Sequence, residues 1–308
     1  MSSSPHKTVL VTGGHGFVGT NLKKVEPGWI YLSSQDHDLR DPEECRQVVE
    51  LHRPDAVVHL ASKVGGILYN IQNSTEILHD NLLINTNILE ACRISGVTRV
   101  LACLSTCAWP DHAEEYPMTE EDLLSGPPQE TNLSYSYSKR LLYIQCKAYR
   151  EQYGLNYSCF APANIYGPYM DCGSNSHFIG ALIDKIENSE DTIHLMGTGS
   201  PLRQQIYVTD LANLIPRLLE HHQSDLPLVV APDHNYSIKR LAEIAILESG
   251  KELSIAWSGD LNGQHRKDCS PAHLKILLSA HGGVHFTPFD KGIRKTIEWY
   301  REFITTHA

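Results

Sequence analysis

Thr8-Val-Leu-Val-Thr-Gly-Gly-His-Gly-Phe-Val-Gly19 is the stretch that decides the fold of this 308-residue chain. Its first five residues are β-branched or apolar and predict a short strand, which leads directly into closely spaced glycines. Such a turn, placed between a strand and a helix, lets the backbone approach a pyrophosphate at the helix N-terminus. We therefore predict dinucleotide binding; the alternative is a glycine-rich turn that binds no nucleotide. The predicted cofactor contacts in the turn are Gly13, Gly16, Phe17, Val18 and Gly19.

Strand and helix patterns alternate outward from this turn. Short apolar runs at 29–32, 55–61 and 99–104 predict further strands, and 81–95 and 135–153 predict helices. A late strand is predicted at 226–231. Because strands and helices alternate, the fold class is predicted as α/β, a doubly wound parallel Rossmann sheet accompanied by a smaller α/β lobe.

Composition limits the possible partners. The chain has 26 Lys and Arg against 36 Asp and Glu, a net charge of −10, so binding to nucleic acid or to an anionic membrane surface is not expected. No apolar run approaches the roughly 20 residues of a membrane span. The eight cysteines form no CxxC pair and no HxxH spacing occurs, which predicts free thiols in a cytoplasmic protein and no metal site.

The end of the second strand bears on cofactor choice. An NAD-specific fold usually places an acid there to bind the ribose 2′-hydroxyl, but this chain has Ser33 and Ser34. Two hydroxyls that could donate to a 2′-phosphate favour NADP. Asp38 and Leu39 are placed to reach the adenine edge, and a surface-turn acid is the alternative for Asp38.

A tyrosine and a lysine near the start of the 135–153 helix are candidates for proton transfer. Tyr135 and Lys139 lie about 40° apart around a helix axis and share a face, whereas Tyr137 points elsewhere. A lysine cation beside a phenol is expected to lower its pKa, so that Tyr135 exchanges a proton near neutral pH. A solvated Tyr–Lys pair is the alternative. Ser105, at the end of the 99–104 strand, can hydrogen-bond the same substrate oxygen.

Behind the glycine turn, Ser105, Tyr135 and Lys139 resemble the catalytic set of the short-chain dehydrogenase/reductase superfamily. The resemblance implies that Lys139 holds the nicotinamide ribose and lowers the pKa of Tyr135. Tyr135 would then protonate the substrate oxygen as hydride arrives from NADPH.

A finer resemblance, over nearly the whole chain, is to the GDP-L-fucose synthases, which epimerise and then reduce GDP-4-keto-6-deoxy-D-mannose. The matching stretches are Val64-Gly65-Gly66-Ile67, Ser105-Thr106-Cys107, Glu130-Thr131-Asn132, Asn164-Ile165-Tyr166-Gly167-Pro168, Ser176-His177, and Gly197-Thr198-Gly199 leading to Arg203. The resemblance implies a 3,5-epimerase and NADPH-dependent 4-reductase. It also implies a homodimer, formed as a four-helix bundle by the helices at 81–95 and 135–153.

Epimerisation beside a 4-keto group needs one base and one acid on opposite faces of the sugar. The resemblance assigns these roles to Cys107 and His177. A buried inert thiol and a surface histidine are the alternatives.

The resemblance also implies binding residues outside the glycine turn. Further cofactor contacts are expected from Pro162, Asn164, Ile165 and His177. Substrate contacts are expected from Gly65, Asn164, Lys185, Met196, Arg203 and Lys267. Three of these are basic and would gather around a diphosphate against the acidic average of the chain, although a solvated helix lysine is an equal alternative for Lys185. The implied division is an NADP-binding domain at 1–168, joined by 204–232, and a substrate-binding lobe at 169–203 and 233–308.

The chain departs from the family pattern around the sugar site. It has Pro162-Ala163-Asn164 and Met170-Asp171-Cys172 where the family has Pro-Thr-Asn and Asp-Asn-Phe, and Met196 replaces a tryptophan. One alternative is therefore a reductase or epimerase of a related 4-keto nucleotide sugar, such as another GDP-deoxysugar or a heptose. Another is an NADP-binding protein without catalysis, which would not need all five catalytic positions.

Overall fold

The computed structural model describes residues 6–173, 176–259 and 264–307. A six-stranded parallel sheet forms its centre, with strand order β10-β5-β4-β3-β1-β2. The strands are β1 (Val9–Thr12), β2 (Ile30–Tyr31), β3 (Ala56–His59), β4 (Arg99–Cys103), β5 (Asn156–Pro162) and β10 (Leu228–Val230). Since β1, β3 and β5 are buried along their length apart from Asn156, they lie between two helical layers.

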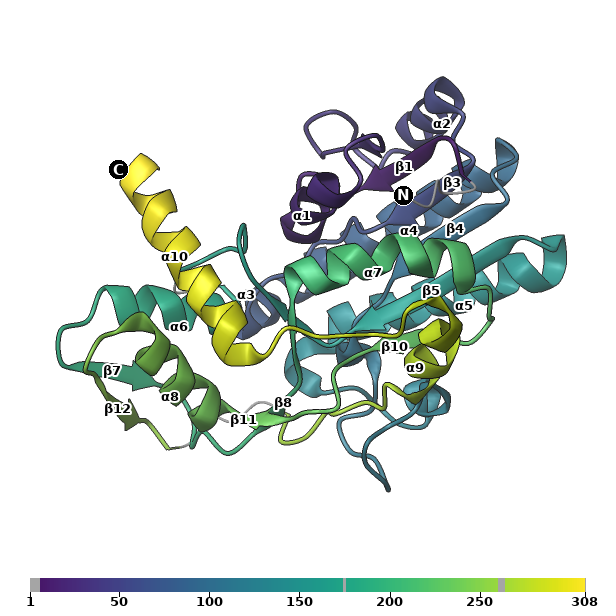
Figure 1. The fold of residues 1–308 in the computed structure, drawn as a ribbon. Coiled ribbons are helices and arrows are strands. Elements are labelled where there is room, and N and C mark those ends of the chain that lie inside the picture. The colour runs from purple at the N-terminus through teal and green to yellow at the C-terminus, as the bar shows by residue number, and fades with distance from the viewer. Residues whose placement is uncertain (1–5, 174–175, 260–263, 308) are drawn as a thin grey trace.

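Helices cover both faces of this sheet (Figure 1). They are α1 (Phe17–Val25), α2 (Pro42–His52), α4 (Ser74–Ile94), α5 (Leu133–Tyr153) and α7 (Val208–His221). Helix α1 packs against α7, while α4 packs against both α2 and α5. The predicted doubly wound α/β fold is confirmed. Helix α4 begins earlier than the predicted residue 81, because the fully buried Ile77 extends its packed face by a turn.

A smaller lobe has its own hydrophobic core. Its elements are α6 (Phe178–Glu187), β7 (Thr192–Leu195), β8 (Leu202–Arg203), β11 (Tyr236–Ser237), α8 (Ile238–Ser249), β12 (Ser254–Trp257) and α10 (Phe289–His307). Strands β6 (Asn164–Tyr166) and β9 (Gln205–Tyr207) pair with each other where the chain passes between the two cores. Short helices complete the fold: α3 (Ile67–Gln72), α9 (Ala272–Leu278), and 3-10 turns η1 (Thr106–Ala108), η2 (Glu120–Leu124), η3 (Glu130–Asn132) and η4 (Ser279–His281).

One predicted boundary needs correction. Residues 233–308 were all expected in the lobe, but α9 packs on β10 at the edge of the large sheet. Cys269, Leu274 and Leu278 are fully buried in the core of the sheet domain. The chain therefore crosses back to the sheet before it ends in α10, and this return places residues 264–269 near the carboxyl ends of the strands.

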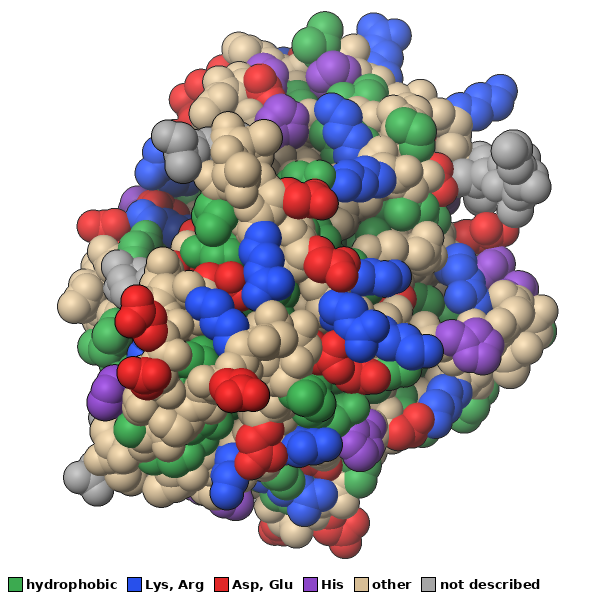
Figure 2. Space-filling view, turned by 60° about the vertical axis from the view of Figure 1, so that its left-hand side comes forward, with side chains coloured by type: hydrophobic (Ala, Val, Ile, Leu, Met, Phe, Trp, Pro, Cys, Tyr) green, Lys and Arg blue, Asp and Glu red, His purple; other side chains and the backbone are tan. Residues whose placement is uncertain are grey.

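The surface carries mixed charge. Figure 2 shows one face of the molecule, on which basic and acidic side chains lie next to one another. Among the described residues, no helix is long and apolar enough to cross a membrane. An anionic ligand must therefore be recognised by a few basic groups gathered locally.

Candidate active site

The glycine turn between β1 and α1 has the shape that a pyrophosphate needs. Gly13 has φ +67°, and a Cβ on it would lie 2.8 Å from the backbone of Ala61. A Cβ on Gly19 would lie 2.5 Å from the carbonyl oxygen of Gly14. Gly16 is the N-cap of α1 and brings no capping side chain, so the first N–H groups of the helix are left for a ligand. These residues fit a dinucleotide phosphate group.

The predicted 2′-phosphate donors are arranged differently from the expectation. The backbone N–H and hydroxyl of Ser33 donate to Asp36 Oδ2 at 2.9 and 2.8 Å. These two hydrogen bonds hold the pKa of Asp36 below its ordinary value. The hydroxyl of Ser33 is therefore occupied by a neighbouring acid, Asp36, that was not among the predicted residues. Asp38 is held by Arg40 through Nε and Nη2, at 2.9 and 2.7 Å, which lowers its pKa to about 2.

Helix α5 places its two candidate catalytic groups on one face, as predicted from their spacing. Tyr135 and Lys139 are buried, whereas the ring of Tyr137 is 40% exposed. Lys139 Nζ donates to the carbonyl oxygen of Cys103, at the end of β4, at 2.8 Å. It lies 5.6 Å from the centroid of the Tyr135 ring. Ser105 lies two residues beyond β4, close enough to the phenol of Tyr135 to act on its pKa, so the end of β4 and helix α5 bring the set together.

The predicted effect on the Tyr135 phenol is wrong in this structure. Burial, followed by the nearby thiols of Cys107 and Cys103, raises its pKa well above the ordinary value. Hydrogen bonds with Ser105 and Ser62 act in the opposite direction without offsetting burial. Burial also lowers the pKa of Lys139. A phenol that stays protonated at neutral pH is suited to donate a proton.

Ser62 is a site residue that the sequence argument missed. It lies just beyond β3 and donates to Asn81 Oδ1 at 2.9 Å, and its side chain acts on the pKa of the Tyr135 phenol. Its position after a buried strand was the available signal, since ligands of open α/β sheets bind beyond the carboxyl ends of strands.

Cys107 lies beside a buried ammonium group. Lys267 Nζ donates to Cys107 Sγ at 3.3 Å and is itself buried. Burial alone would raise the pKa of this thiol, but Lys267, a hydrogen bond with Ser105, and Arg203 together hold that pKa below its ordinary value. The arrangement favours thiolate, the basic form of cysteine. Lys267 was expected to contact the substrate diphosphate. In the structure its ammonium group donates a hydrogen bond to the thiol of Cys107.

Replacing Lys267 with Met is therefore expected to raise the pH at which Cys107 becomes reactive. At pH 7 its alkylation should slow by about tenfold or more, since removing the adjacent cation disfavours thiolate. The measurement is the pH profile of iodoacetamide labelling at Cys107, read by peptide mass spectrometry. Lys185→Met is the matched control and should leave the profile unchanged. An unchanged profile in Lys267→Met would show that Lys267 does not set the state of the thiol.

His177 approaches the same site from the lobe. It is the N-cap residue of α6, and it is exposed. The surrounding protein, followed by the positive charge of Lys267, lowers the pKa of His177, and Asp171 opposes this. Lys267 therefore acts electrostatically on both His177 and Cys107. A histidine with a lowered pKa is neutral at pH 7 and can accept a proton.

The remaining predicted residues border the site less directly. Arg203, in β8, is largely enclosed; burial lowers its pKa, and Cys107 and Asp111 oppose the shift. Lys185 Nζ donates to the carbonyl of His194 at 2.5 Å, so it is tied to β7. Met196 is 57% exposed, which leaves it free to contact a ligand.

Four further predicted residues lie at or near the strand ends. Gly65 N donates to Asn70 Oδ1 at 3.0 Å, and a Cβ on Gly65 would lie 2.5 Å from the ring of Tyr69. Asn164 Nδ2 donates to the carbonyl of Gln204 at 2.9 Å. Pro162 ends β5 and Ile165 lies in β6, so both follow the sheet edge where the other candidates gather.

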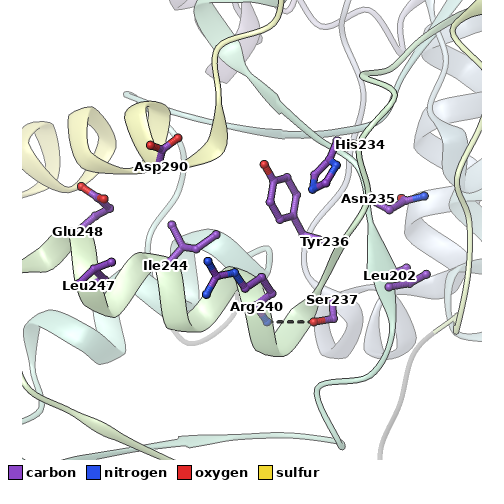
Figure 3. Close-up of a pocket in the computed structure, with 10 residues that line it drawn as sticks. All are labelled: Leu202, His234, Asn235, Tyr236, Ser237, Arg240, Ile244, Leu247, Glu248 and Asp290. Atoms are coloured by element: carbon purple, nitrogen blue, oxygen red, sulfur yellow. Dashed lines mark hydrogen bonds between the residues drawn. The ribbon is translucent and has the colours of Figure 1, made fainter.

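A concavity of about 680 Å³ lies elsewhere on the lobe, between β8, β11, α8 and the first turn of α10 (Figure 3). Its charged side chains include Arg240 and Glu248, which are paired with Glu243 and Arg294. None of Ser105, Cys107, Tyr135, Lys139 or His177 lines it. We place the chemistry beyond the strand ends, because the acid, base and hydroxyl groups converge there.

Comparisons with known proteins show what the chain is similar to. Residues 9–231 match the NAD dependent epimerase/dehydratase family. The chain is 35% identical to a GDP-L-fucose synthase of Dictyostelium discoideum, covering 96% of this chain and 95% of that one. It is 33% identical to a probable GDP-L-fucose synthase of Drosophila melanogaster, covering 96% and 98%. A crystal structure of a GDP-L-fucose synthetase from Naegleria fowleri bound to NADP superposes with a TM-score of 0.88 at 32% identity, covering 97% and 94%.

Proposed function

Because this chain belongs to the NAD dependent epimerase/dehydratase family, we propose that it is a 3,5-epimerase and NADPH-dependent 4-reductase that converts GDP-4-keto-6-deoxy-D-mannose to GDP-L-fucose. The observation that carries the proposal is one site that holds two sets of groups. Ser105, Tyr135 and Lys139 are the groups for reduction. Cys107, which accepts a hydrogen bond from Lys267, and His177 are the groups for epimerisation.

Epimerisation uses the two groups with lowered pKa values. A thiolate or a neutral imidazole removes a proton from a carbon beside the 4-keto group, which leaves an enolate on the sugar. The other group, once it has taken a proton from water, donates that proton to the opposite face of the same carbon, and the first group releases the proton it removed to water. Cys107 and His177 lie on different domains, which is consistent with action from two sides of a sugar held between them. Lys267, which donates a hydrogen bond to Cys107 Sγ, stabilises the thiolate.

Reduction uses the protonated phenol. NADPH, when bound along the glycine turn, supplies a hydride to C4. Tyr135 gives its proton to the 4-oxygen, which becomes a hydroxyl, and Ser105 hydrogen-bonds the same oxygen. Lys139 is positioned by the Cys103 carbonyl within reach of the phenol that must be reprotonated. Arg203 holds the substrate diphosphate.

The proposal is tested by the loss of nicotinamide absorbance with GDP-4-keto-6-deoxy-D-mannose. We expect NADPH to be oxidised, with NADH a poorer donor. The chain departs from the family pattern at 170–172 and at Met196, so a GDP-4-keto-heptose is the matched comparison substrate. Faster turnover of the heptose would replace the proposed substrate, and NADPH binding without turnover of either sugar would contradict the proposed function.

We further propose a homodimer built on α5. Leu133, Tyr137, Leu141 and Ile144 lie at helical spacing and are each 40–42% exposed, which makes an apolar stripe on the surface of one subunit. Two copies of α4 and α5 would bury this stripe as a four-helix bundle.

Leu141→Arg is expected to convert the dimer to a monomer, because it places a charge in the centre of that stripe. The measurement is light scattering at micromolar protein. The control is Leu247→Arg on α8, which changes a leucine that is 74% exposed outside the stripe and should leave the mass unchanged. A wild-type mass of one subunit would contradict the proposed dimer.

A cytoplasmic location is part of the same proposal. All eight cysteines are free thiols in the structure. Cys107 needs its thiol for the chemistry above, and reducing compartments preserve thiols.

A further inference from the structure

Cys107 and Lys267 form a close contact between sulfur and nitrogen. Lys267 Nζ donates to Cys107 Sγ at 3.3 Å, although the two residues are 160 positions apart in the sequence. Lys267 is buried, whereas Cys107 keeps part of its surface exposed. All eight cysteines are free thiols, and the hydrogen-bonding neighbour of the Cys107 sulfur is an amine. The contact therefore places a thiol and an amine where they can be joined covalently.

The segment that carries Lys267 is fixed by the chain beside it. Met118 N donates to the carbonyl of Asp268 at 2.9 Å, and Ser270 N donates to the carbonyl of Met118 at 2.7 Å. The carboxylate of Asp268 also accepts from Arg266 Nε at 2.6 Å. The amine of Lys267 is therefore presented by an ordered backbone and not by a free surface loop.

The backbone around Cys107 is also ordered. Cys107 lies in the middle of η1, and its N–H donates to the hydroxyl of Ser105 at 3.2 Å. Ala108 N donates to the carbonyl of Ser105 at 2.9 Å, and the carbonyl of Ala108 accepts from Arg140 Nε at 2.6 Å. Because both partners are held from their own sides, an oxygen atom inserted between Sγ and Nζ requires only a small approach of the two atoms.

We propose that Cys107 and Lys267 form a reversible covalent bridge in which one oxygen atom joins Sγ to Nζ. The oxidant is dioxygen. Thiolate and ammonium together carry three protons on sulfur and nitrogen. New S–O and O–N bonds form, sulfur and nitrogen each give up two electrons, and dioxygen takes up all four. Its second oxygen atom leaves with two of the protons as water, and the third proton stays on nitrogen.

The lysine decides how oxidation at this thiol ends. Thiolate is the reactive form of cysteine, and a singly oxidised sulfur otherwise condenses with a second thiol or proceeds to sulfinic acid. Here the atom in contact with the sulfur is nitrogen, so the oxygen is captured between them. The bridge removes the Cys107 thiol from acid/base chemistry, and epimerisation stops. That consequence rests on the proposed function, whereas formation of the bridge depends only on the contact.

The test is peptide mass spectrometry of the full-length protein kept in oxygen-saturated buffer, with and without later reduction by dithiothreitol. We expect the peptides of Cys107 and Lys267 to be joined, with one oxygen more and two hydrogens fewer than their sum. Dithiothreitol should separate them, because two dithiols return four electrons and release the bridging oxygen as water. Lys267→Arg keeps the positive charge without the amine and should give no joined peptide. Cys172→Ala, which removes a partly exposed thiol outside the contact, should give the same joined peptide as the wild type.

The result that would overturn the proposal is a wild-type protein whose two peptides stay separate after oxidation. Cys107 recovered as a thiol, a sulfinic acid or a disulfide would each have that meaning. Iodoacetamide labelling of Cys107 and deuterium exchange beside the keto group of the sugar should both fall in proportion to the joined fraction and return after reduction. A bridge that forms in a protein whose reduced form does not act on the sugar would contradict the proposed function and leave the bridge established.

Discussion

Replacing Tyr135 with Phe is expected to lower kcat for reduction of the 4-keto sugar by about 10²- to 10⁴-fold, the usual contribution of a positioned general acid. The variant removes only the hydroxyl from a buried ring, so packing around α5 is retained. NADPH affinity, measured by fluorescence titration, should change little, because the glycine turn and Lys139 remain. Exchange of protons next to the keto group should also continue, since Cys107 and His177 are untouched.

The matched control is Tyr137→Phe on the same helix. Tyr137 is two residues away and 40% exposed, and Arg140 lies over its ring at 5.5 Å. Removal of the Tyr137 hydroxyl should leave kcat for reduction of the 4-keto sugar unchanged. Equal loss in both variants would mean that the effect comes from α5 and not from the phenol of Tyr135.

The second large effect is expected at Cys107. Cys107→Ala should slow deuterium exchange at the carbons beside the keto group by about 10²- to 10⁴-fold, because an acid/base group is removed. Reduction should persist and give a product with the original configuration at one or both of these carbons. The measurement is proton NMR of the substrate and product in deuterated water.

The pH dependence of this step follows from the lowered pKa of Cys107. A depressed pKa keeps the thiolate present at lower pH than in an ordinary cysteine, and exchange should be lost only as the pH falls through that value. Cys172→Ala is the control, since Cys172 is a free, partly exposed thiol on the lobe. Unchanged exchange in Cys107→Ala, with exchange lost in His177→Asn, would leave His177 as the sole acid/base group.

Local spacing predicted the parts of the site that lie within single elements. The glycine turn after β1 and the shared face of Tyr135 and Lys139 follow from backbone geometry within a few residues. The Ser105 position follows from the end of β4. Sequence predicts these features because each depends on one strand or one helix.

Long-range contacts could not be predicted in the same way. Lys267 donates a hydrogen bond to Cys107 although the two residues are 160 positions apart in the sequence. Nothing in the sequence around either residue indicates that contact. The raised pKa of Tyr135 arises mainly from burial, and burial cannot be predicted from the four-residue spacing between Tyr135 and Lys139. The bonding of Ser33 to Asp36 and the return of α9 to the sheet likewise depend on packing.

The central claim is that one site performs both epimerisation and reduction. The most direct test is a single reaction of the wild-type protein with NADPH and GDP-4-keto-6-deoxy-D-mannose in deuterated water, with the product analysed by NMR. We predict GDP-L-fucose that carries deuterium at C3 and C5, formed in step with NADPH oxidation. A reduced sugar without deuterium at either carbon would contradict the claim, and would leave Cys107 and His177 without a role in the chemistry.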